Sequence, residues 1–107
     1  MAEDAQAARV QWRAGRLYIS REVHDACLAG CPALALLARD GQWLVLPLLG
    51  GAGGLQVKIR NAHGDRVVES QEFFRRQGLE DDAAPRDFVL AAVPGSGSFE
   101  LITPDVS

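Results

Sequence analysis

Three side chains that can ligate a metal ion, His24, Cys27 and Cys31, lie in one short segment with the pattern H-x2-C-x3-C. On a continuous helix this spacing would place an imidazole and two thiols on one stripe, which suits zinc. A fourth ligand at a suitable spacing is missing, and Gly30 with Pro32 is expected to end the helix before Cys31. We therefore interpret Cys27 as a small buried residue and His24 as an exposed one, and we expect no metal or other cofactor.

Groups that could perform acid-base or nucleophilic catalysis are few. The chain has two histidines, His24 and His63, and neither belongs to a recognisable nucleophile motif. The acidic run at residues 80–82 is interpreted as a solvated loop. The glycine-rich residues 50–54 stand between two expected strands, with no helix and no Lys-Ser/Thr after them, so a phosphate-binding loop is not expected. The sequence therefore predicts a protein that is not an enzyme.

Basic residues gather in two segments, residues 9–21 and residues 56–66. Together the segments hold seven of the eleven basic side chains and one of the fourteen acidic ones; the seven are Arg9, Arg13, Arg16, Arg21, Lys58, Arg60 and Arg66. If the segments lie side by side, they form one face that could contact phosphates of double-stranded DNA and, through the arginines, base edges. The alternative is an ordinary solvated surface, neutralised by acids such as Glu22, Asp65 and Glu72.

A second candidate surface surrounds Phe73 and Phe74. Adjacent residues of a helix point about 100° apart, so both rings are buried only where the helix is covered over a wide arc. One exposed ring beside Arg75 and Arg76 would suit a protein partner or self-association, because aromatic and arginine side chains are favoured interface anchors. The alternative interpretation places both rings in the core. An exposed apolar patch near these rings or near residues 48–49 would favour a protein partner over DNA.

The elements expected to position these residues begin with a hairpin at residues 8–20, which turns at Ala14 and Gly15. Ser20 is a helix N-cap candidate, and Val23, Ala26 and Cys27 follow at helical spacing. Asp40-Gly41 then separates two apolar runs at residues 34–38 and 43–48, which is a strong hairpin signal. The first half therefore reads strand, strand, helix, strand, strand.

The same order returns after residues 50–54, at an offset of about fifty residues. Strands are expected at residues 55–60, 66–69, 88–93 and 98–103, with a helix that follows Ser70 and ends at Gly78. One such unit cannot cover its own sheet, so two units are expected to close around a common core. The predicted fold is a mainly β, small closed barrel with two short helices, built from two ββαββ repeats.

The domain organisation follows from these repeats. Residues 1–8 are expected to form a flexible tail, and residues 9–107 a single barrel domain. Within it, the first repeat covers about residues 9–49, the glycine-rich joint residues 50–54 and the second repeat about residues 55–104.

A resemblance to a known family rests on residues 15–23, which read Gly-Arg-Leu-Tyr-Ile-Ser-Arg-Glu-Val, and on the short helix and apolar hairpin that follow. This order resembles the SpoVT/AbrB swapped-hairpin family, including the MraZ proteins, which carry two such units in one chain. The turn at Gly64-Asp65-Arg66 is also similar to that of cradle-loop barrels. Ser20 and Ser70 stand where that family usually has proline. The resemblance covers residues 10–47 well and residues 57–103 more weakly, and it implies a barrel whose first hairpins bind DNA.

Composition sets the outer limits of these expectations. The chain has 107 residues and a net charge of −3, which fits one domain and gives no overall attraction to nucleic acid. Its two cysteines cannot form a disulfide framework, and residues 1–10 lack the pattern of a signal peptide, so a cytoplasmic protein is expected. Polar residues 39–42 interrupt the longest apolar neighbourhood, so no membrane-spanning segment is expected.

Two functions from different classes follow from these observations. The first is an AbrB-like DNA-binding transcriptional regulator or antitoxin-like protein that uses the basic first hairpins. The second is a non-enzymatic protein-interaction or assembly module that retains the barrel without binding DNA. A cradle for a small ligand is a third possibility.

Overall fold

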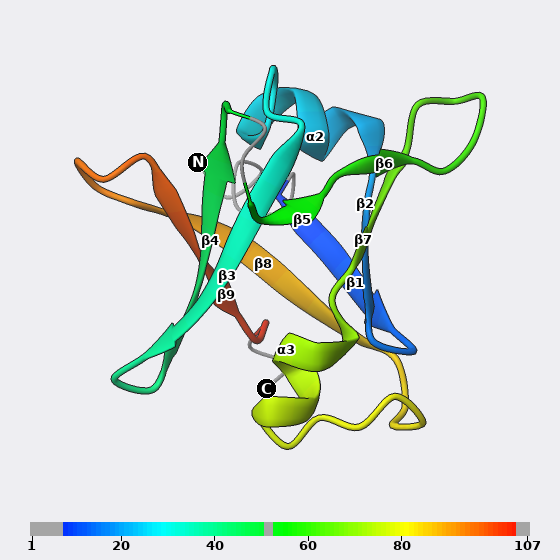
Figure 1. Ribbon diagram of the computed structural model, residues 1–107, viewed down its shortest axis with the longest axis vertical. Helices are drawn as coiled ribbons and strands as arrows, with labels where there is room; N and C mark the ends of the chain where they lie inside the picture. The colour runs from blue at the N-terminus through cyan, green and yellow to red at the C-terminus, as the bar shows by residue number, and fades with distance from the viewer. Residues whose placement is uncertain (1–7, 51–52, 105–107) are drawn as a thin grey trace.

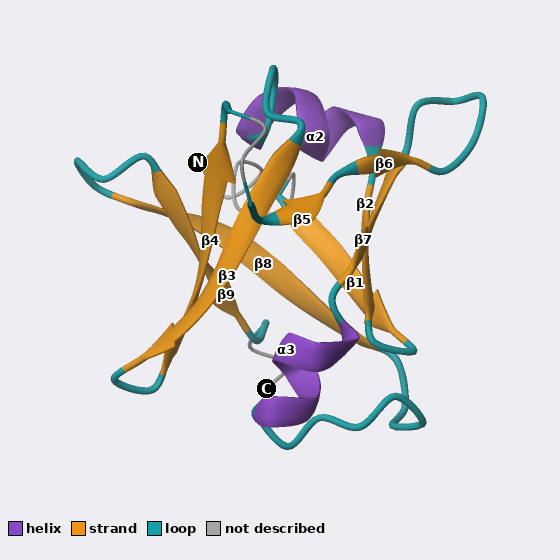
Figure 2. Cartoon of the chain, in the orientation of Figure 1, coloured by secondary structure: helices purple, strands orange, loops and turns teal. Residues whose placement is uncertain are grey.

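The structure is a computed structural model that describes residues 8–50 and 53–104. The first half contains β1 (Arg9–Arg13), β2 (Arg16–Ile19), α2 (Arg21–Cys27), β3 (Ala33–Arg39) and β4 (Gln42–Leu48). The second half contains β5 (Leu55–Gln56), β6 (Lys58–Ile59), β7 (Arg66–Glu69), α3 (Gln71–Arg76), β8 (Arg86–Val93) and β9 (Ser98–Ile102). Strands dominate and two short helices accompany them, as the sequence predicts (Figure 2).

All strands belong to one antiparallel sheet in the order β5-β3-β4-β9-β8-β1-β2-β7-β6 (Figure 1). The two ends of this order, β5 and β6, are consecutive in the chain and separated only by Val57, so the polypeptide itself joins the sheet ends. The backbone N–H of Val57 donates to the carbonyl of Pro32 at 2.9 Å, which holds this junction beside the start of β3. The sheet is therefore a nearly closed barrel, and the predicted fold class is confirmed.

The two halves of the chain are interleaved within the barrel. The strands that precede the helix in each half, β2 and β7, pair with each other, and so do the last strands, β4 and β9. The first strand of each half adds to the strand that follows the helix in the other half, since β1 pairs with β8 and β5 pairs with β3. Each half therefore completes the sheet of the other, and the two share a single core.

Two hairpin turns follow directly from their residue types. Ala14 and Gly15, between β1 and β2, have φ angles of 53° and 81°, and Asp40 and Gly41, between β3 and β4, have φ angles of 53° and 79°. Two consecutive positive φ angles are typical of type I′ turns, whose twist matches that of the flanking strands. The turns fix the register of both hairpins, and this register decides which side chains face outward.

The two helices begin differently, although each follows a serine. The Oγ of Ser20 accepts a hydrogen bond from the backbone N–H of Val23 at 3.2 Å and so caps α2, as expected. Ser70 is buried, and its Oγ donates to the carbonyl of Gly15 at 2.7 Å instead of capping α3. Ser70 therefore takes the position of Ser20 but not its capping role, because a carbonyl of the first half engages its hydroxyl.

Aromatic side chains from both halves meet in the core. Trp12, Phe74 and Phe88 are at most 1% exposed. The ring of Phe74 lies 6.1 Å from the ring of Trp12 and 6.3 Å from that of Phe88, measured between centroids. Figure 1 shows α2 and α3 at opposite ends of the barrel, so Phe74 enters the core from the α3 end. Within the described part of the chain, no helix is long and apolar enough to cross a membrane.

Candidate functional site

One half of the barrel surface carries outward basic side chains. Along β1 and β2, exposed or half-buried residues alternate with buried ones such as Trp12 and Leu17, so the intervening side chains point away from the core. Lys58 of β6 is opposite Val67, which is opposite Tyr18, so Lys58 shares this outer surface. We call the following residues the basic face: Arg9, Arg13, Arg16, Tyr18, Lys58 and Arg60.

Tyr18 is the centre of the basic face. The guanidinium carbon of Arg13 lies 4.4 Å from the centroid of the Tyr18 ring, and that of Arg60 lies 4.9 Å from it. Both distances are within cation–π range, so the ring holds two guanidinium groups from different halves of the chain. Contacts with Arg13, and to a smaller extent with Arg16, lower the pKa of the Tyr18 hydroxyl. The two basic segments therefore approach each other at this tyrosine.

Carboxylates neutralise only part of the basic face. Arg16 pairs with Glu69 of β7 at 2.9 Å, and Arg9 approaches Asp87 of β8 at 3.7 Å. In the part of the chain that the structure describes, the other three cations have no carboxylate within 4.0 Å; these are Arg13, Lys58 and Arg60. A chain with a net charge of −3 thus carries a local excess of positive charge on one side of its barrel.

Two arginines of the predicted DNA-binding set lie elsewhere. Arg66 faces the opposite side of β7 from Val67 and donates to the carbonyl of Gly64 at 2.7 Å. The side chain of Arg21 packs over Gly64 as well, since a Cβ placed on that glycine would lie 2.9 Å from its Cδ. The prediction of one continuous face therefore fails for these two residues, because strand alternation and the Gly64 turn hold them at the end of the barrel near α2.

The Gly64 turn is organised by Asp65. Its carboxylate accepts hydrogen bonds from the side chain of Asn61 at 3.1 Å and from the backbone N–H of Arg21 at 2.9 Å. These two hydrogen bonds, in that order of size, lower the pKa of the Asp65 carboxyl. Asp65 therefore joins the first residue of α2 to the turn before β7, which is a structural role.

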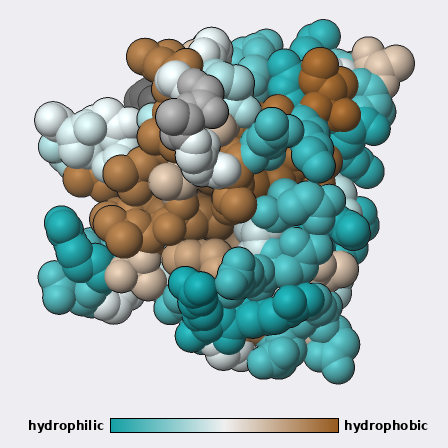
Figure 3. Space-filling model, in the orientation of Figure 1, coloured by the Kyte–Doolittle hydropathy of each residue, from teal (hydrophilic) through white to brown (hydrophobic). Residues whose placement is uncertain are grey.

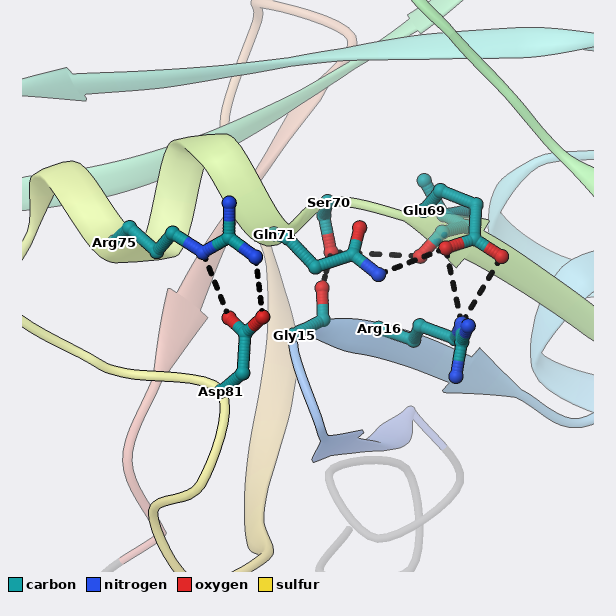
Figure 4. A network of polar contacts seen from close by, with 8 residues as sticks. Gly15, Arg16, Glu69, Ser70, Gln71, Arg75 and Asp81 are labelled. Atoms are coloured by element: carbon teal, nitrogen blue, oxygen red, sulfur yellow. Dashed lines mark hydrogen bonds and ion pairs between the residues drawn. The ribbon is translucent and has the colours of Figure 1, made fainter.

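A polar network fixes the turn of β1 and β2 against the start of α3 (Figure 4). Glu69 accepts hydrogen bonds from Gln71 at 2.9 Å and from Arg16 at 2.9 and 3.0 Å, and both contacts lower its pKa, Gln71 more than Arg16. Gly15 lies so close to α3 that a Cβ on it would be 2.4 Å from the Cγ of Gln71. The network therefore positions Arg16 at the edge of the basic face and leaves it less free than Arg13.

A cavity of about 660 Å³ opens between α3 and the edge formed by β3 and β5. Four of its lining residues are charged, namely Glu69, Glu72, Arg75 and Arg76. Each of them is already paired, Glu69 with Arg16, Arg75 with Asp81, and Arg76 with Glu72. The cavity thus presents no unpaired charged group to a ligand, which gives little support to a small-ligand cradle.

Most residues of the predicted partner surface on α3 already make contacts within the protein itself. Phe74 is fully buried, so its assignment to a partner surface is wrong, because the helix inserts this ring into the aromatic core. Phe73 is half-buried and packs edge-on against Trp43 at 6.1 Å. Arg75 and Arg76 are exposed and engaged in ion pairs with Asp81 and Glu72.

The metal-like segment does not assemble in space. His24 is 8% exposed, and its Nδ1 lies 3.1 Å from the carboxylate of Asp25, so the expectation that it is exposed is wrong. α2 ends at Cys27, before Cys31, as expected from Gly30. Burial raises the pKa of the Cys27 thiol, which makes it a poorer ligand. Among residues 8–50 and 53–104, no three His, Cys, Asp or Glu side chains form a group that could hold a metal ion.

The other half of the barrel surface is apolar. Across β3, β4, β9 and β8, the register aligns Leu37 with Leu44, Leu44 with Glu100, and Glu100 with Ala91. This row and its neighbours on the same side form what we call the apolar face: Ala35, Leu37, Leu44, Leu46, Leu48, Val89, Ala91, Val93 and Ile102. Figure 3 shows the corresponding hydrophobic area over β3 and β4, with hydrophilic residues toward α3 and β7.

The sequence contained a signal for the apolar face. In β3 and β4 both alternating sets of residues are apolar, since Leu34 and Val45 fill the core while Leu37 and Leu44 face outward. A strand with one solvated face normally alternates apolar with polar residues. Leu49, at the end of this surface, is 76% exposed, which places an apolar patch at residues 48–49. The patch named above as favouring a protein partner is therefore present.

Comparisons of this chain with family models, with curated proteins and with solved structures give no match. The functional assignment consequently rests on the two surfaces themselves.

Proposed function

We propose that this protein is an AbrB-like DNA-binding transcriptional regulator or antitoxin-like protein that contacts duplex DNA through its basic face. The observation that carries the proposal is the pair of arginines, Arg13 and Arg60, that flank Tyr18 and have no carboxylate partner among the described residues. Charge segregation in a chain with a net charge of −3 supports it, because carboxylates pair with only two of the five cations of the basic face among the described residues.

The geometry favours phosphate contacts. Each guanidinium lies over the Tyr18 ring, which limits its motion, and a guanidinium can form bidentate hydrogen bonds with a phosphate. Lys58 adds a flexible charge on the neighbouring strand. Such contacts supply affinity and orientation, and sequence preference would require an arginine to reach a base edge. Free thiols at Cys27 and Cys31 accord with the further proposal that the protein acts in the cytoplasm.

The test is fluorescence anisotropy with a labelled random-sequence duplex at low salt. Wild-type protein should bind, Arg60→Glu should weaken binding, and Arg13→Glu combined with Arg60→Glu should abolish it. Arg76→Glu is the matched control, because it reverses one charge on an exposed part of α3, away from the basic face. Absence of wild-type binding at low salt, or equal losses with Arg60→Glu and Arg76→Glu, would overturn the proposal.

The apolar face favours a second candidate, a non-enzymatic protein-interaction or assembly module that retains the barrel without DNA binding. Contiguous apolar surface on an antiparallel sheet is unusual unless another chain covers it. The two candidates use different residues, so the duplex-binding measurement separates them.

A further inference from the structure

The outer side of β3, β4, β9 and β8 has the dimensions of a small protein interface. Strand spacing of about 4.8 Å and a rise of about 3.4 Å per residue give four strands of about seven residues a footprint of roughly 19 by 24 Å. Two sheets can pack face to face when such surfaces are apolar. The footprints of two copies add up to about 900 Å², which is below the range of stable interfaces and typical of weak, transient ones, so we expect an occupant of this face alone to bind with micromolar rather than nanomolar affinity.

The shape of the apolar face is suited to packing against a second copy of the same surface. β4 presents a row of three leucines, Leu44, Leu46 and Leu48, which we call the ridge; Leu46 lies opposite the shorter Ala35 of β3. A groove of about 300 Å³ runs along this ridge and is lined by Leu37, the ridge and residues 96–98. A two-fold axis would set the ridge of each copy into the groove of the other, which is how an isologous interface achieves self-complementarity.

The charges on this side of the barrel are also self-complementary. Arg39 lines the groove, and Glu100 lies in the middle row of the face, opposite both Leu44 and Ala91. Neither side chain has an ion-pair partner among the described residues. A two-fold axis turns one cation and one anion on the same surface into two equivalent cross-pairs, whereas an unrelated partner would need a separate match for each.

We propose that this protein forms a homodimer through the apolar face, with the Leu44, Leu46 and Leu48 ridges interdigitated and with Arg39 of each copy near Glu100 of the other. The dimer deepens the protein-interaction candidate by naming its partner, and it does not depend on DNA binding. It accounts for apolar side chains on both sides of β3 and β4, since burial in the dimer removes the outer set from water.

The experiment is sedimentation equilibrium of the full chain from about 1 µM to about 200 µM, a range that spans the dissociation constant of a small interface. Wild-type protein should change from monomer to dimer within it. Arg39→Glu and Glu100→Arg should each raise the dissociation constant about tenfold, because both cross-pairs become repulsive. The double variant Arg39→Glu with Glu100→Arg should restore the wild-type value.

Two variants serve as references for the charge reversals. Leu46→Asp should leave only monomer, and its fold is checked by circular dichroism; if it does not fold, the charge variants alone decide. Arg76→Glu changes a charge on α3 and should leave dimerisation unaltered. A protein that stays monomeric throughout, or a dimer insensitive to the single reversals, or a double variant no better than the singles would overturn the proposal. A monomer would leave the DNA-binding measurement unaffected, so the two failures are distinguishable.

Discussion

The salt dependence of DNA binding can be worked out from the ion pairs of the basic face. The basic face contains five cations, and two of them, Arg9 and Arg16, already have carboxylate partners. Each phosphate that a cation neutralises contributes about −0.9 to the slope of log affinity against log salt. The three cations without a carboxylate partner in the described part of the chain therefore give a slope of about −2.7, and all five would give about −4.5. The ion pairs of the folded protein thus set the range of the measured slope.

The perturbation is Arg13→Gln combined with Arg60→Gln, which removes charge without introducing repulsion. Raising salt from about 50 to about 200 mM should weaken wild-type binding by about 40-fold at the smaller slope and about 500-fold at the larger. Loss of two phosphate contacts changes the slope by about 1.8, so the same salt increase should weaken the variant by only about 3-fold to 40-fold.

The assay is anisotropy of a labelled duplex of about 20 base pairs, titrated at several salt concentrations that bracket this range. Arg76→Gln removes one charge from α3 and should leave the slope unchanged. An unaltered slope in the double variant would refute the assignment of Arg13 and Arg60 to phosphates. A wild-type slope near zero would refute the electrostatic argument as a whole.

Three further predictions concern the scaffold and are measured by chemical denaturation. Phe74→Ala should lower the free energy of unfolding by about 3–5 kcal/mol, and the half-buried Phe73→Ala by less; equal losses would contradict the core assignment. Gly15→Ala should lower the free energy of unfolding more than Gly41→Ala does. Both glycines have a positive φ, but of the two only Gly15 has atoms within 4 Å of an added Cβ. Equal losses of stability would show that backbone strain alone matters. Folding lowers the pKa of Asp65, so the ionised carboxylate stabilises the fold above about pH 4, and this contribution is lost as pH falls through the pKa of the folded state. The Asp65→Asn variant should therefore lose less stability than the wild type between about pH 5 and pH 2. Parallel curves of stability against pH would contradict this assignment.

Local sequence signals were sufficient for most of the fold. Asp40-Gly41 and Ala14-Gly15 predicted their turns because these residue types adopt positive φ readily in two-residue hairpins, and Ser20 predicted its cap because the bond is local. Ser70 has the same local context but a different hydrogen bond, since its partner Gly15 comes from the other half of the chain. Such a contact depends on the pairing of β2 with β7, which local pattern does not specify.

For the candidate site, too, the sequence indicated local features but not contacts between the two halves of the chain. Arg9 and Arg13 belong to a segment singled out by its charge, and they point outward because the side-chain period of a strand is two. Arg66 was assigned to the same face from its charge alone, and the register of β7 places it on the other side. The stacking of Arg60 on Tyr18 depends on how the turn after β6 approaches β2, which only the tertiary structure defines.

The basic face and the apolar face lie on opposite halves of one barrel, and this separation has a physical consequence. The strands of the apolar face are consecutive in the sheet order, β3-β4-β9-β8. The strands β1-β2-β7-β6, on the side of the basic face, follow them, and β5 lies at the end of the order beside β3. A dimer formed through the apolar faces would therefore leave both basic faces exposed and directed away from each other. Each basic face could then bind its own segment of duplex. Dimerisation would therefore bridge two DNA segments and would not enlarge the contact with one segment. Substitutions at Leu46 and at Arg60 thus perturb two surfaces that share a scaffold and no side chain.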